Sequence, residues 1–445
     1  MPAAEIFARI VEAQKSGIPL GIVSVCSAHP YALQAALEQA REEGTPALIE
    51  SSANQVNQYG GYTGMKPADF RALVRSLAAQ AGLPADRILL GGDHLGPYPW
   101  RGEPAGQAMA QARELVAESV RAGYLKLHLD ASMPLGGDRL EPRGGLDPRL
   151  VARREAELAS DAEEAILEAE RSGRAGPPPV YVIGTDVPSP GGISTEAEGV
   201  PVTTPEELQR TVTLCAEEFR TRGLERAWSR VFAVVAQPGV EFGDQAVRPY
   251  DRQRAAALCR AARELPGLVL EGHSTDYQPR ERLREMVEDG VAVLKVGPAL
   301  TFVVREALFA LQRVEEELLG GEPGARLSRL METLEQAMLA EPGHWQGYYT
   351  GEERDLRLAR RYSLSDRCRY YWRVPQVEDS VRRLLANLKG RALPWTLLSQ
   401  YLPAQSRAVR YGSLAAEPLA LVRAAVREVL RDYSRATRPA DRKGV

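Results

Sequence analysis

Three histidines in this sequence stand beside a carboxylate or two residues away from one, and each pair follows a short apolar segment. The pairs are Asp93 with His94, His128 with Asp130, and Glu271 with His273. Imidazole and carboxylate groups act as general acids and bases, and they are also common ligands of divalent ions. A fourth histidine, His29, follows another apolar segment, and only His344 lies elsewhere. The pattern predicts one polar site that transfers protons or holds a metal ion.

Two of the pairs have both a catalytic and a structural interpretation. In the first interpretation Asp93 is a general base and His94 a metal ligand, whereas in the second Asp93 caps the following helix and His94 bonds a backbone carbonyl. Glu271 and His273 are two residues apart, so in a strand they point to the same side. There they could share Mg²⁺, Mn²⁺ or Zn²⁺, or form a hydrogen bond without a metal.

Further candidates follow two other apolar segments. Asp186 comes soon after Gly184 and is a third candidate metal ligand, with a turn aspartate as the alternative. His128 and Asp130 share a face, and with Ser132 they either bind a ligand or support other ligands from behind. The expected catalytic residues are Asp93, Asp186 and Glu271. The expected ligands of a Zn, Mn or Mg ion are His94, Asp186, Glu271 and His273.

Other polar residues at the ends of apolar segments suit a phosphorylated sugar. Lys295 and Ser274 could bind a phosphate near Gly297, although a lysine there could also form a Schiff base. Asn54 and Gln55 begin an amide-rich run that suits sugar hydroxyls, unless that run is a plain hydrophilic loop. The expected substrate-binding residues are Asn54, Gln55, His128, Asp130, Ser132, Gln237, Ser274, Lys295 and Gly297.

The elements that must position these residues alternate along the chain. Short apolar segments predict strands at 21–25, 47–50, 88–92, 125–129, 180–184, 231–236, 268–271 and 292–296. Helical spacing predicts helices between them, including 32–43, 67–81, 105–122, 205–222 and 251–265. Buried strands that alternate with helices indicate a parallel sheet, and eight of them close into a (β/α)₈ TIM barrel. The site is then expected where the carboxyl ends of the strands converge.

After the last predicted strand the sequence pattern is helical only. Helices are expected at 305–319, 327–339, 377–388 and 419–433. We therefore expect a barrel over residues 1–304 and a helical C-terminal extension over residues 305–445 that packs on it. A separate small domain is the alternative. The aromatic residues 370–372 are expected in the core or at an interface, and they lead us to expect a homo-oligomer.

The composition excludes several classes of protein. Hydrophobic residues make up 44% of the chain and charged residues 26%, which is enough apolar material for a large core. The net charge is −3 with both signs interspersed, which argues against a nucleic-acid surface. No apolar run is long enough to span a membrane. The four cysteines form no disulfide-like or CxxC pattern, so a cytoplasmic protein is expected.

Eight stretches of the sequence resemble those of a known family. They are CSAHP, ESSANQVNQYGGYTGM, GGDHLGP, KLHLDASM, YVIGTDVPSPGG, QPGVEF, EGHSTDYQ and LKVGPALTF. The resemblance is to the GatZ/KbaZ family and covers nearly the whole chain, because the helical tail with YYW and LSQYLP is similar too. It implies a non-catalytic subunit that stabilises the catalytic subunit of tagatose-bisphosphate aldolase.

The family is related to class II aldolases, which are metal-dependent (β/α)₈ barrels. In those enzymes an Asp-His pair after the third strand supplies a catalytic base and a zinc ligand, and Asp93 with His94 matches it. Two further zinc-binding histidines of the aldolases follow strands five and seven. This chain departs there, because the nearest equivalents are Asp186 and Glu271, with His273 two residues on. The resemblance thus implies a metal site with altered ligands.

Two functional hypotheses follow from the resemblance. Some members of the wider family resemble ketose 4-epimerases, so one hypothesis is a metal-dependent 4-epimerase that interconverts fructose 6-phosphate and tagatose 6-phosphate by retro-aldol chemistry. The other is the non-catalytic subunit of tagatose-1,6-bisphosphate aldolase, with the catalytic subunit as its partner. A sugar-binding barrel without chemistry is a third interpretation.

Overall fold

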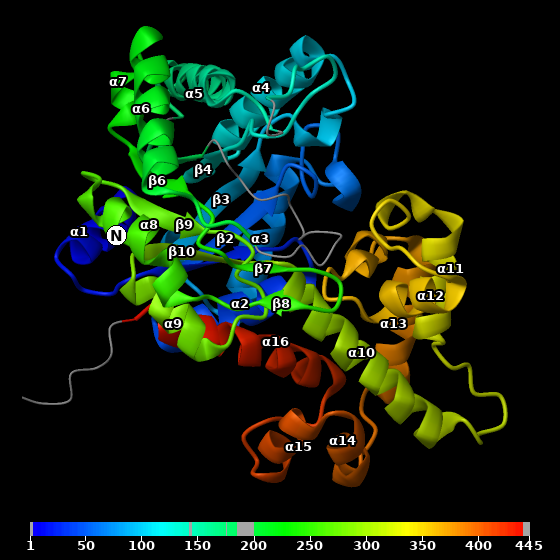
Figure 1. Cartoon of the computed structure of the whole chain (residues 1–445). Coiled ribbons are helices and arrows are strands. Elements are labelled where there is room, and N and C mark those ends of the chain that lie inside the picture. The colour runs from blue at the N-terminus through cyan, green and yellow to red at the C-terminus, as the bar shows by residue number, and fades with distance from the viewer. Residues whose placement is uncertain (1–2, 142–144, 175, 185–199, 439–445) are drawn as a thin grey trace, which may run out of the picture.

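The chain folds into a closed barrel of eight parallel strands, surrounded by helices (Figure 1). The computed structural model describes residues 3–141, 145–174, 176–184 and 200–438. The barrel strands are β1 (Ile22–Cys26), β2 (Ala47–Ser52), β3 (Ile88–Leu95), β4 (Lys126–Leu129), β5 (Val180–Ile183), β6 (Val231–Val235), β9 (Val269–Gly272) and β10 (Val291–Val296). Their order around the barrel is β1-β10-β9-β6-β5-β4-β3-β2. The predicted (β/α)₈ TIM barrel is confirmed, and all eight predicted segments supply its strands.

Helices follow the strands, and all but the last of them cover the outside of the barrel. They are α2 (Pro30–Glu43), α3 (Pro67–Ala81), α4 (Ala105–Arg121), α5 (Pro148–Arg171), α6 (Pro205–Thr221), α8 (Arg252–Glu264), α9 (Arg280–Glu288) and α10 (Pro298–Leu319). Several begin with proline at the first helical position, where its missing N–H costs nothing. In α6, Thr204 and Glu207 form a capping box that fixes the first turn. Among the described residues, no helix is both long enough and apolar enough to cross a bilayer.

Short elements that the sequence did not predict decorate the two ends of the barrel. The strands β7 (Glu241–Phe242) and β8 (Val247–Arg248) form an antiparallel pair after β6. A one-turn helix, α7 (Glu225–Trp228), precedes β6. Three 3₁₀ turns, η1 (Gly61–Thr63), η2 (Ala85–Arg87) and η3 (Tyr98–Trp100), lie in the connections after β2 and on both sides of β3.

The amino end of the barrel is closed by the first helix, α1 (Ala3–Lys15). Its apolar face places Ile6, Phe7 and Ile10 in one buried cluster with inward-facing residues of the strands. The rings of Phe7 and Phe232 lie 4.5 Å apart. The floor of the barrel is therefore apolar, and the polar strand-end residues lie at the opposite, carboxyl end.

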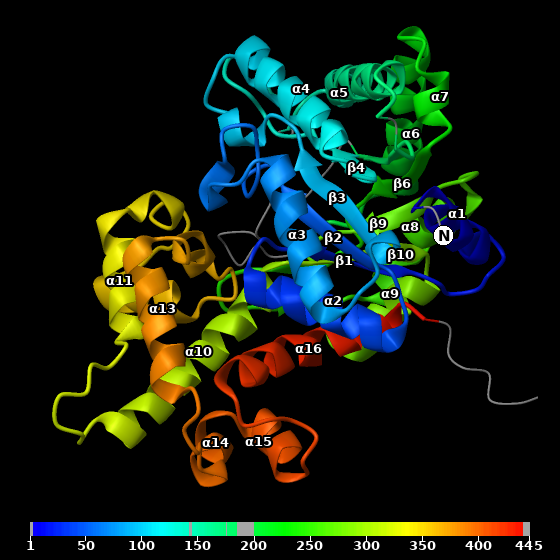
Figure 2. The same cartoon turned by 180° about the vertical axis from the view of Figure 1, so that it is seen from behind.

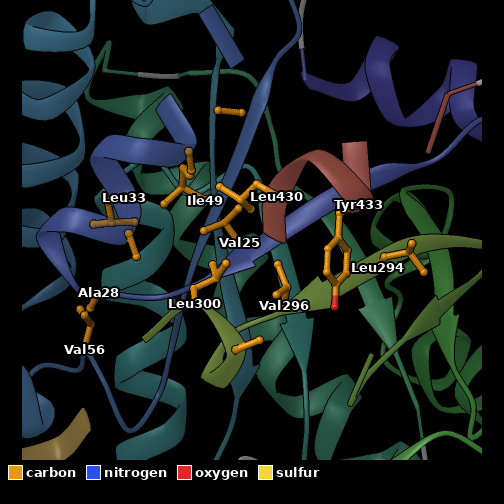
Figure 3. Close-up of a cluster of buried hydrophobic side chains, with 14 of the residues drawn as sticks. Val25, Ala28, Leu33, Ile49, Val56, Leu294, Val296, Leu300, Leu430 and Tyr433 are labelled. Carbon is orange, nitrogen blue, oxygen red and sulfur yellow. The ribbon is translucent and has the colours of Figure 1, made fainter. Parts of the chain in front are cut away.

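The last helix of the sequence returns to the barrel. The helix α16 (Pro418–Ala436) contacts α2, α9 and α10, and both views show it running beside α2 (Figures 1 and 2). Its Leu430 and Tyr433 belong to the buried cluster that includes Val25 of β1 (Figure 3). The Tyr433 hydroxyl donates to the carbonyl of Thr275 at 2.6 Å. The chain thus uses α16 to cover strands β1 and β10, while α10 extends away from them.

The remaining helices of the extension lie beside the barrel (Figure 1). They are α11 (Leu330–Ala340), α12 (Glu353–Tyr362), α13 (Pro375–Leu388), α14 (Trp395–Tyr401) and α15 (Pro403–Arg410), with the 3₁₀ turns η4 (Pro342–His344) and η5 (Arg367–Tyr371). A buried ion pair joins them to α10, because Arg305 Nε donates to Asp366 Oδ1 at 2.8 Å. The predicted boundary at 304/305 falls inside α10 and stays a prediction.

Two lysines and two glutamates form a buried charged layer above the apolar floor. Lys126 Nζ lies 2.8 Å from Glu50 Oε1 and 2.8 Å from Glu271 Oε2. Lys295 Nζ lies 3.0 Å from Glu50 Oε2 and 3.1 Å from Glu271 Oε1. Each carboxylate therefore binds one lysine with each oxygen, and each lysine bridges both carboxylates. Gly91 makes room for this layer, because a Cβ there would lie 2.8 Å from Glu50 Cγ.

We expect Lys126→Met to lower the free energy of unfolding by about 3–5 kcal/mol, the usual cost of breaking a buried ion pair from one side. The side chains of Glu50 and Glu271, which are fully buried, would each lose a cation. Urea denaturation followed by circular dichroism measures the change. The control Arg121→Met removes an exposed arginine that pairs with Glu118 and Glu168, and should cost at most about 1 kcal/mol. Equal losses in the two variants would contradict the importance of the charged layer.

Candidate active site at the carboxyl end of the barrel

Three histidines meet directly above the charged layer. His94, His128 and His273 come from the ends of β3, β4 and β9, and their ring centroids lie 4.8, 4.9 and 5.0 Å apart. All three side chains are buried. Asp93 joins them, since one ligand atom from each of the four residues lies within 4.8 Å of the others. We call the three rings the imidazole cluster; the structure brings together residues that the sequence placed at three separate strand ends.

Asp130 holds His94 in place. Asp130 Oδ2 lies 2.6 Å from His94 Nδ1, while Asp130 Oδ1 accepts bonds from the backbone N–H and the hydroxyl of Ser132. Burial lowers the pKa of His94, but the charges of Asp93 and Asp130 outweigh it and raise the pKa overall. With Nδ1 engaged, the Nε2 atom of His94 faces Asp93, at 3.7 Å from Oδ1. His94 also has a backbone φ of 46°, an uncommon value for a residue with a side chain.

The other two rings of the imidazole cluster are held as neutral groups. His128 Nδ1 accepts the backbone N–H of His94 at 3.1 Å, and burial lowers the pKa of His128. His128 Nε2 is buried without a hydrogen-bond partner among the described residues. His273 Nε2 lies 3.1 Å from Glu271 Oε1, and burial, together with the charge of Lys295, lowers the pKa of His273 to about 3.

Asp93 is a carboxylate that lines the cavity directly beside His94. It contacts Lys295 Nζ directly and lies 3.4 Å from His128 Nδ1. Burial would raise the pKa of Asp93, but the charges of His94 and Lys295 hold it well below its usual value. Asp93 is therefore ionised at neutral pH and can accept a hydrogen bond from a substrate hydroxyl at the mouth of the barrel.

The imidazole cluster also has the donor set of a divalent metal site. Imidazoles with a carboxylate suit Zn²⁺ in particular, and a carboxylate behind a ligating histidine, as Asp130 stands behind His94, is the usual supporting arrangement. With Nδ1 accepting the His94 N–H, neutral His128 carries its proton on Nε2, an unpartnered hydrogen-bond donor among the described residues, so the free imidazole nitrogens for an ion come from His94 and His273. These residues fit a divalent ion. The sequence had assigned His128 to substrate binding, so the cluster differs in composition from the expected ligand set.

Glu271, one of the expected ligands, contacts His273 of the cluster but is also held by the charged layer. Both carboxylate oxygens of Glu271 are engaged by Lys126 and Lys295 in the charged layer. The charges of these lysines overcome the effect of burial and hold the pKa of Glu271 well below its usual value. Asp186 lies outside the described residues. The catalytic and metal-binding roles expected for both residues stay predictions.

A cavity of about 440 Å³ opens above the imidazole cluster, between the barrel and the extension. Its walls include five of the residues expected to bind substrate: Asn54, Gln55, Ser274, Lys295 and Gly297. The other four do not line the cavity. His128, Asp130 and Ser132 support His94, while Gln237 Oε1 accepts the backbone N–H groups of Gly239 and Val240 in a turn. The cavity has the size of a small-molecule site.

The extension supplies one wall of the cavity, which the sequence did not predict. Arg369, Tyr370 and Trp372 from η5 and the residues after it line the cavity opposite the barrel. The expectation that residues 370–372 serve only the core or an interface was therefore too narrow. The Trp372 ring lies 5.8 Å from that of His29, which caps α2 by accepting the N–H of Tyr31. Burial lowers the pKa of His29 to about 4, so this histidine is neutral.

The charged layer was the second feature that sequence reasoning missed. Glu50 and Lys126 lie within apolar strands and follow no motif. Their signal was period-two spacing, because a charged side chain two positions before an inward-facing strand-end residue must point into the barrel. Lys126 precedes His128 by two residues, as Glu271 precedes His273.

Comparison with known proteins agrees with this architecture. The family described as D-tagatose-1,6-bisphosphate aldolase subunit GatZ/KbaZ-like matches residues 7–438. Proteins named D-tagatose-1,6-bisphosphate aldolase subunit GatZ, from Salmonella heidelberg (strain SL476) and Klebsiella pneumoniae, are each 46% identical to this chain over 424 residues. In both cases the match covers 95% of this chain and 97% of the relative.

A solved structure is similar over nearly its whole length. It is a Sinorhizobium meliloti 1021 protein described as a probable tagatose 6 phosphate kinase, 44% identical to this chain, with a TM-score of 0.83. The similarity covers 94% of this chain and 100% of that one. With one family matching from α1 to α16 and relatives at this identity, the chain belongs to the GatZ/KbaZ-like family.

Proposed function

We propose that this chain is a GatZ-type subunit of a tagatose-1,6-bisphosphate aldolase, which stabilises a separate catalytic subunit in the cytoplasm. The observation that carries the proposal is the identity of 46%, along nearly the full length of both chains, with relatives named as that subunit. The cavity above the imidazole cluster would then bind a phosphorylated ketose.

A second function is favoured by the interior of the barrel. A chain that only stabilises a partner has no need for ionised Asp93, the imidazole cluster or an open cavity above them, and buried charges are costly unless they are paired. We propose as the alternative that the site interconverts fructose 6-phosphate and tagatose 6-phosphate by inversion at C4. Asp93 Oδ1 and His94 Nε2 lie 3.7 Å apart and both residues line the cavity, so both can face one bound sugar, which supports this chemistry.

Simple enolisation cannot invert C4 of a 2-ketose, since the C4 hydrogen is not adjacent to the carbonyl, but retro-aldol cleavage of the C3–C4 bond can. Asp93 would take the proton of the C4 hydroxyl, the C3–C4 bond would break, and its electron pair would pass to C2 and C3 as an enediolate. C4 becomes an aldehyde, which turns and presents its other face. Re-formation of the C3–C4 bond then draws the proton back from Asp93 to the C4 oxygen.

The other residues would act around Asp93. Lys295 contacts the carboxylate and holds it ionised and oriented. Asn54 and Gln55 on the cavity wall would bind sugar hydroxyls and keep the cleaved aldehyde in place. His94 and His273 of the imidazole cluster are the residues that would hold a divalent ion. Such an ion, when bound, supplies a Lewis acid for the C2 oxygen.

The subunit proposal predicts that adding this chain to the catalytic tagatose-bisphosphate aldolase of the same organism prolongs the life of that enzyme. A partner that binds only the native state stabilises it by mass action. The half-life of aldolase activity on heating should rise by at least about threefold, and the two chains should co-elute in gel filtration. An equal mass of an unrelated protein is the control. Unchanged half-life together with separate elution would rule the role out.

The alternative predicts conversion of fructose 6-phosphate to tagatose 6-phosphate by this chain alone, in the presence of Zn²⁺, Mn²⁺ or Mg²⁺. Asp93→Asn should lower kcat by about 10²–10⁴-fold, the usual contribution of a general base. Asp379→Asn, which removes a carboxylate 61% exposed on α13, should leave it unchanged. Product would be measured by chromatography after dephosphorylation. No product from the native chain with any of the three metals would exclude the reaction.

The imidazole cluster predicts metal binding that can be measured without activity. After incubation with Zn²⁺ and dialysis, elemental analysis should give about one ion per chain for the native protein and close to none for His273→Ala. His344→Ala, which alters the histidine in the extension, should bind as the native chain does. A native chain that retains no ion would contradict the metal site, and equal binding by His273→Ala would place the ion elsewhere.

A further inference from the structure

Arg369 lines the cavity from the side of the extension. One of its terminal nitrogens, Nη1, donates to the backbone carbonyls of Ser365 and Asp366, and the other, Nη2, donates to the Tyr370 hydroxyl at 3.0 Å. The guanidinium carbon lies 4.6 Å from the centre of the Tyr370 ring. These contacts hold the side chain in one position on the cavity wall.

The charge of Arg369 is not neutralised by an ion pair within the described residues. Lys295 in the charged layer and Arg305 beside Asp366 have carboxylate partners, whereas the nearby Arg367 bonds the backbone carbonyl of His344 and lies outside the cavity wall. No carboxylate oxygen of the described chain lies within 4.0 Å of the Arg369 guanidinium. Its neighbour Asp366 is engaged elsewhere, since Oδ1 accepts from Arg305 and Oδ2 accepts from Thr301. A partly buried cation that faces a cavity without a counter-ion is a place for an anion.

The positions where barrels usually bind phosphate are already engaged here. That site lies near the last two strands, at the amino end of the helix that follows. In this chain the backbone N–H groups of Gly297 and Ala299 both donate to Asp276 Oδ1, at 3.0 and 2.8 Å. Lys295 contacts three carboxylates at once. Asp276 accepts both of these N–H groups, so they are not free to bind an additional anion.

We propose that Arg369 binds the phosphate group of the phosphorylated ketose, so that the extension, and not the barrel, recognises the phosphate. The inference rests on the proposed function for the nature of the sugar. The guanidinium fork offers paired N–H donors to phosphate oxygens, which a lysine cannot match. The sugar carbons then extend across the cavity toward His94 and Asp93 on the opposite wall.

The test is isothermal titration calorimetry on the full-length chain with three probes: tagatose 6-phosphate, unphosphorylated tagatose and inorganic phosphate. Arg369→Gln should weaken the binding of tagatose 6-phosphate by at least about tenfold, the scale of a charge-assisted hydrogen bond, and leave the binding of tagatose unchanged. Arg383→Gln, on an exposed arginine of α13 outside the cavity wall, should bind all three probes as the native chain does. Equal binding of tagatose 6-phosphate by the native chain and Arg369→Gln overturns the inference.

Inorganic phosphate separates this inference from the proposed function. If the native chain binds phosphate and Arg369→Gln does not, the anion site stands even where neither sugar binds. If both bind phosphate equally, or the native chain binds neither phosphate nor tagatose 6-phosphate, the site is excluded. Should Arg369→Gln fail to fold, Arg369→Lys keeps the charge without the fork. It should still bind tagatose 6-phosphate several-fold more weakly than the native chain, and native affinity in that variant would count against the proposal.

Discussion

The structure depends on four buried charges that share the middle of the barrel. Glu50, Lys126, Glu271 and Lys295 neutralise one another in a closed layer, in which removing any one side chain takes a counter-charge from two others. Below the layer the barrel interior is apolar, and the apolar face of α1 packs on it. Above it, Lys295 contacts Asp93 and Glu271 contacts His273, so the reactive groups take their positions and their charges from the layer that supports them.

The barrel and the strand-end groups could be predicted from the sequence because their signals are local. An apolar segment followed by Asp-His reports both a strand and the place where it ends. The charged layer gave no such signal. Its members come from four strands, and which lysine meets which carboxylate depends on the register of the closed barrel, a property of all eight strands together. The sequence could therefore identify Lys295 as a site residue but not show that Glu50 and Glu271 hold it.

The placement of the extension on the barrel could not be predicted, for a related reason. Helical periodicity located α11, α13 and α16, but it does not say which outer face of the barrel each helix covers. That placement follows from single long-range contacts. The helix α10 begins directly after β10. Its Arg305 bonds Asp366, the residue that precedes η5, and so fixes where η5 starts. The turn then carries Arg369 to the cavity, so a pair distant in sequence decides what faces the imidazole cluster.

The site is either functional or a remnant of an active site that has lost its function. The free-energy cost of keeping each feature helps to decide between the two. The charged layer does not discriminate, because loss of any one charge is penalised even in a chain without activity. Backbone strain distinguishes a functional site from a remnant better than the charged layer does. Among the described residues five other than glycine have positive φ, and two of them, His94 at 46° and Ser274 at 52°, line the cavity. Such conformations cost of order 1–3 kcal/mol and concentrate at functional sites. A chain with no task for its cavity could relieve this strain, and its presence at two strand ends favours a site that still binds its ligand.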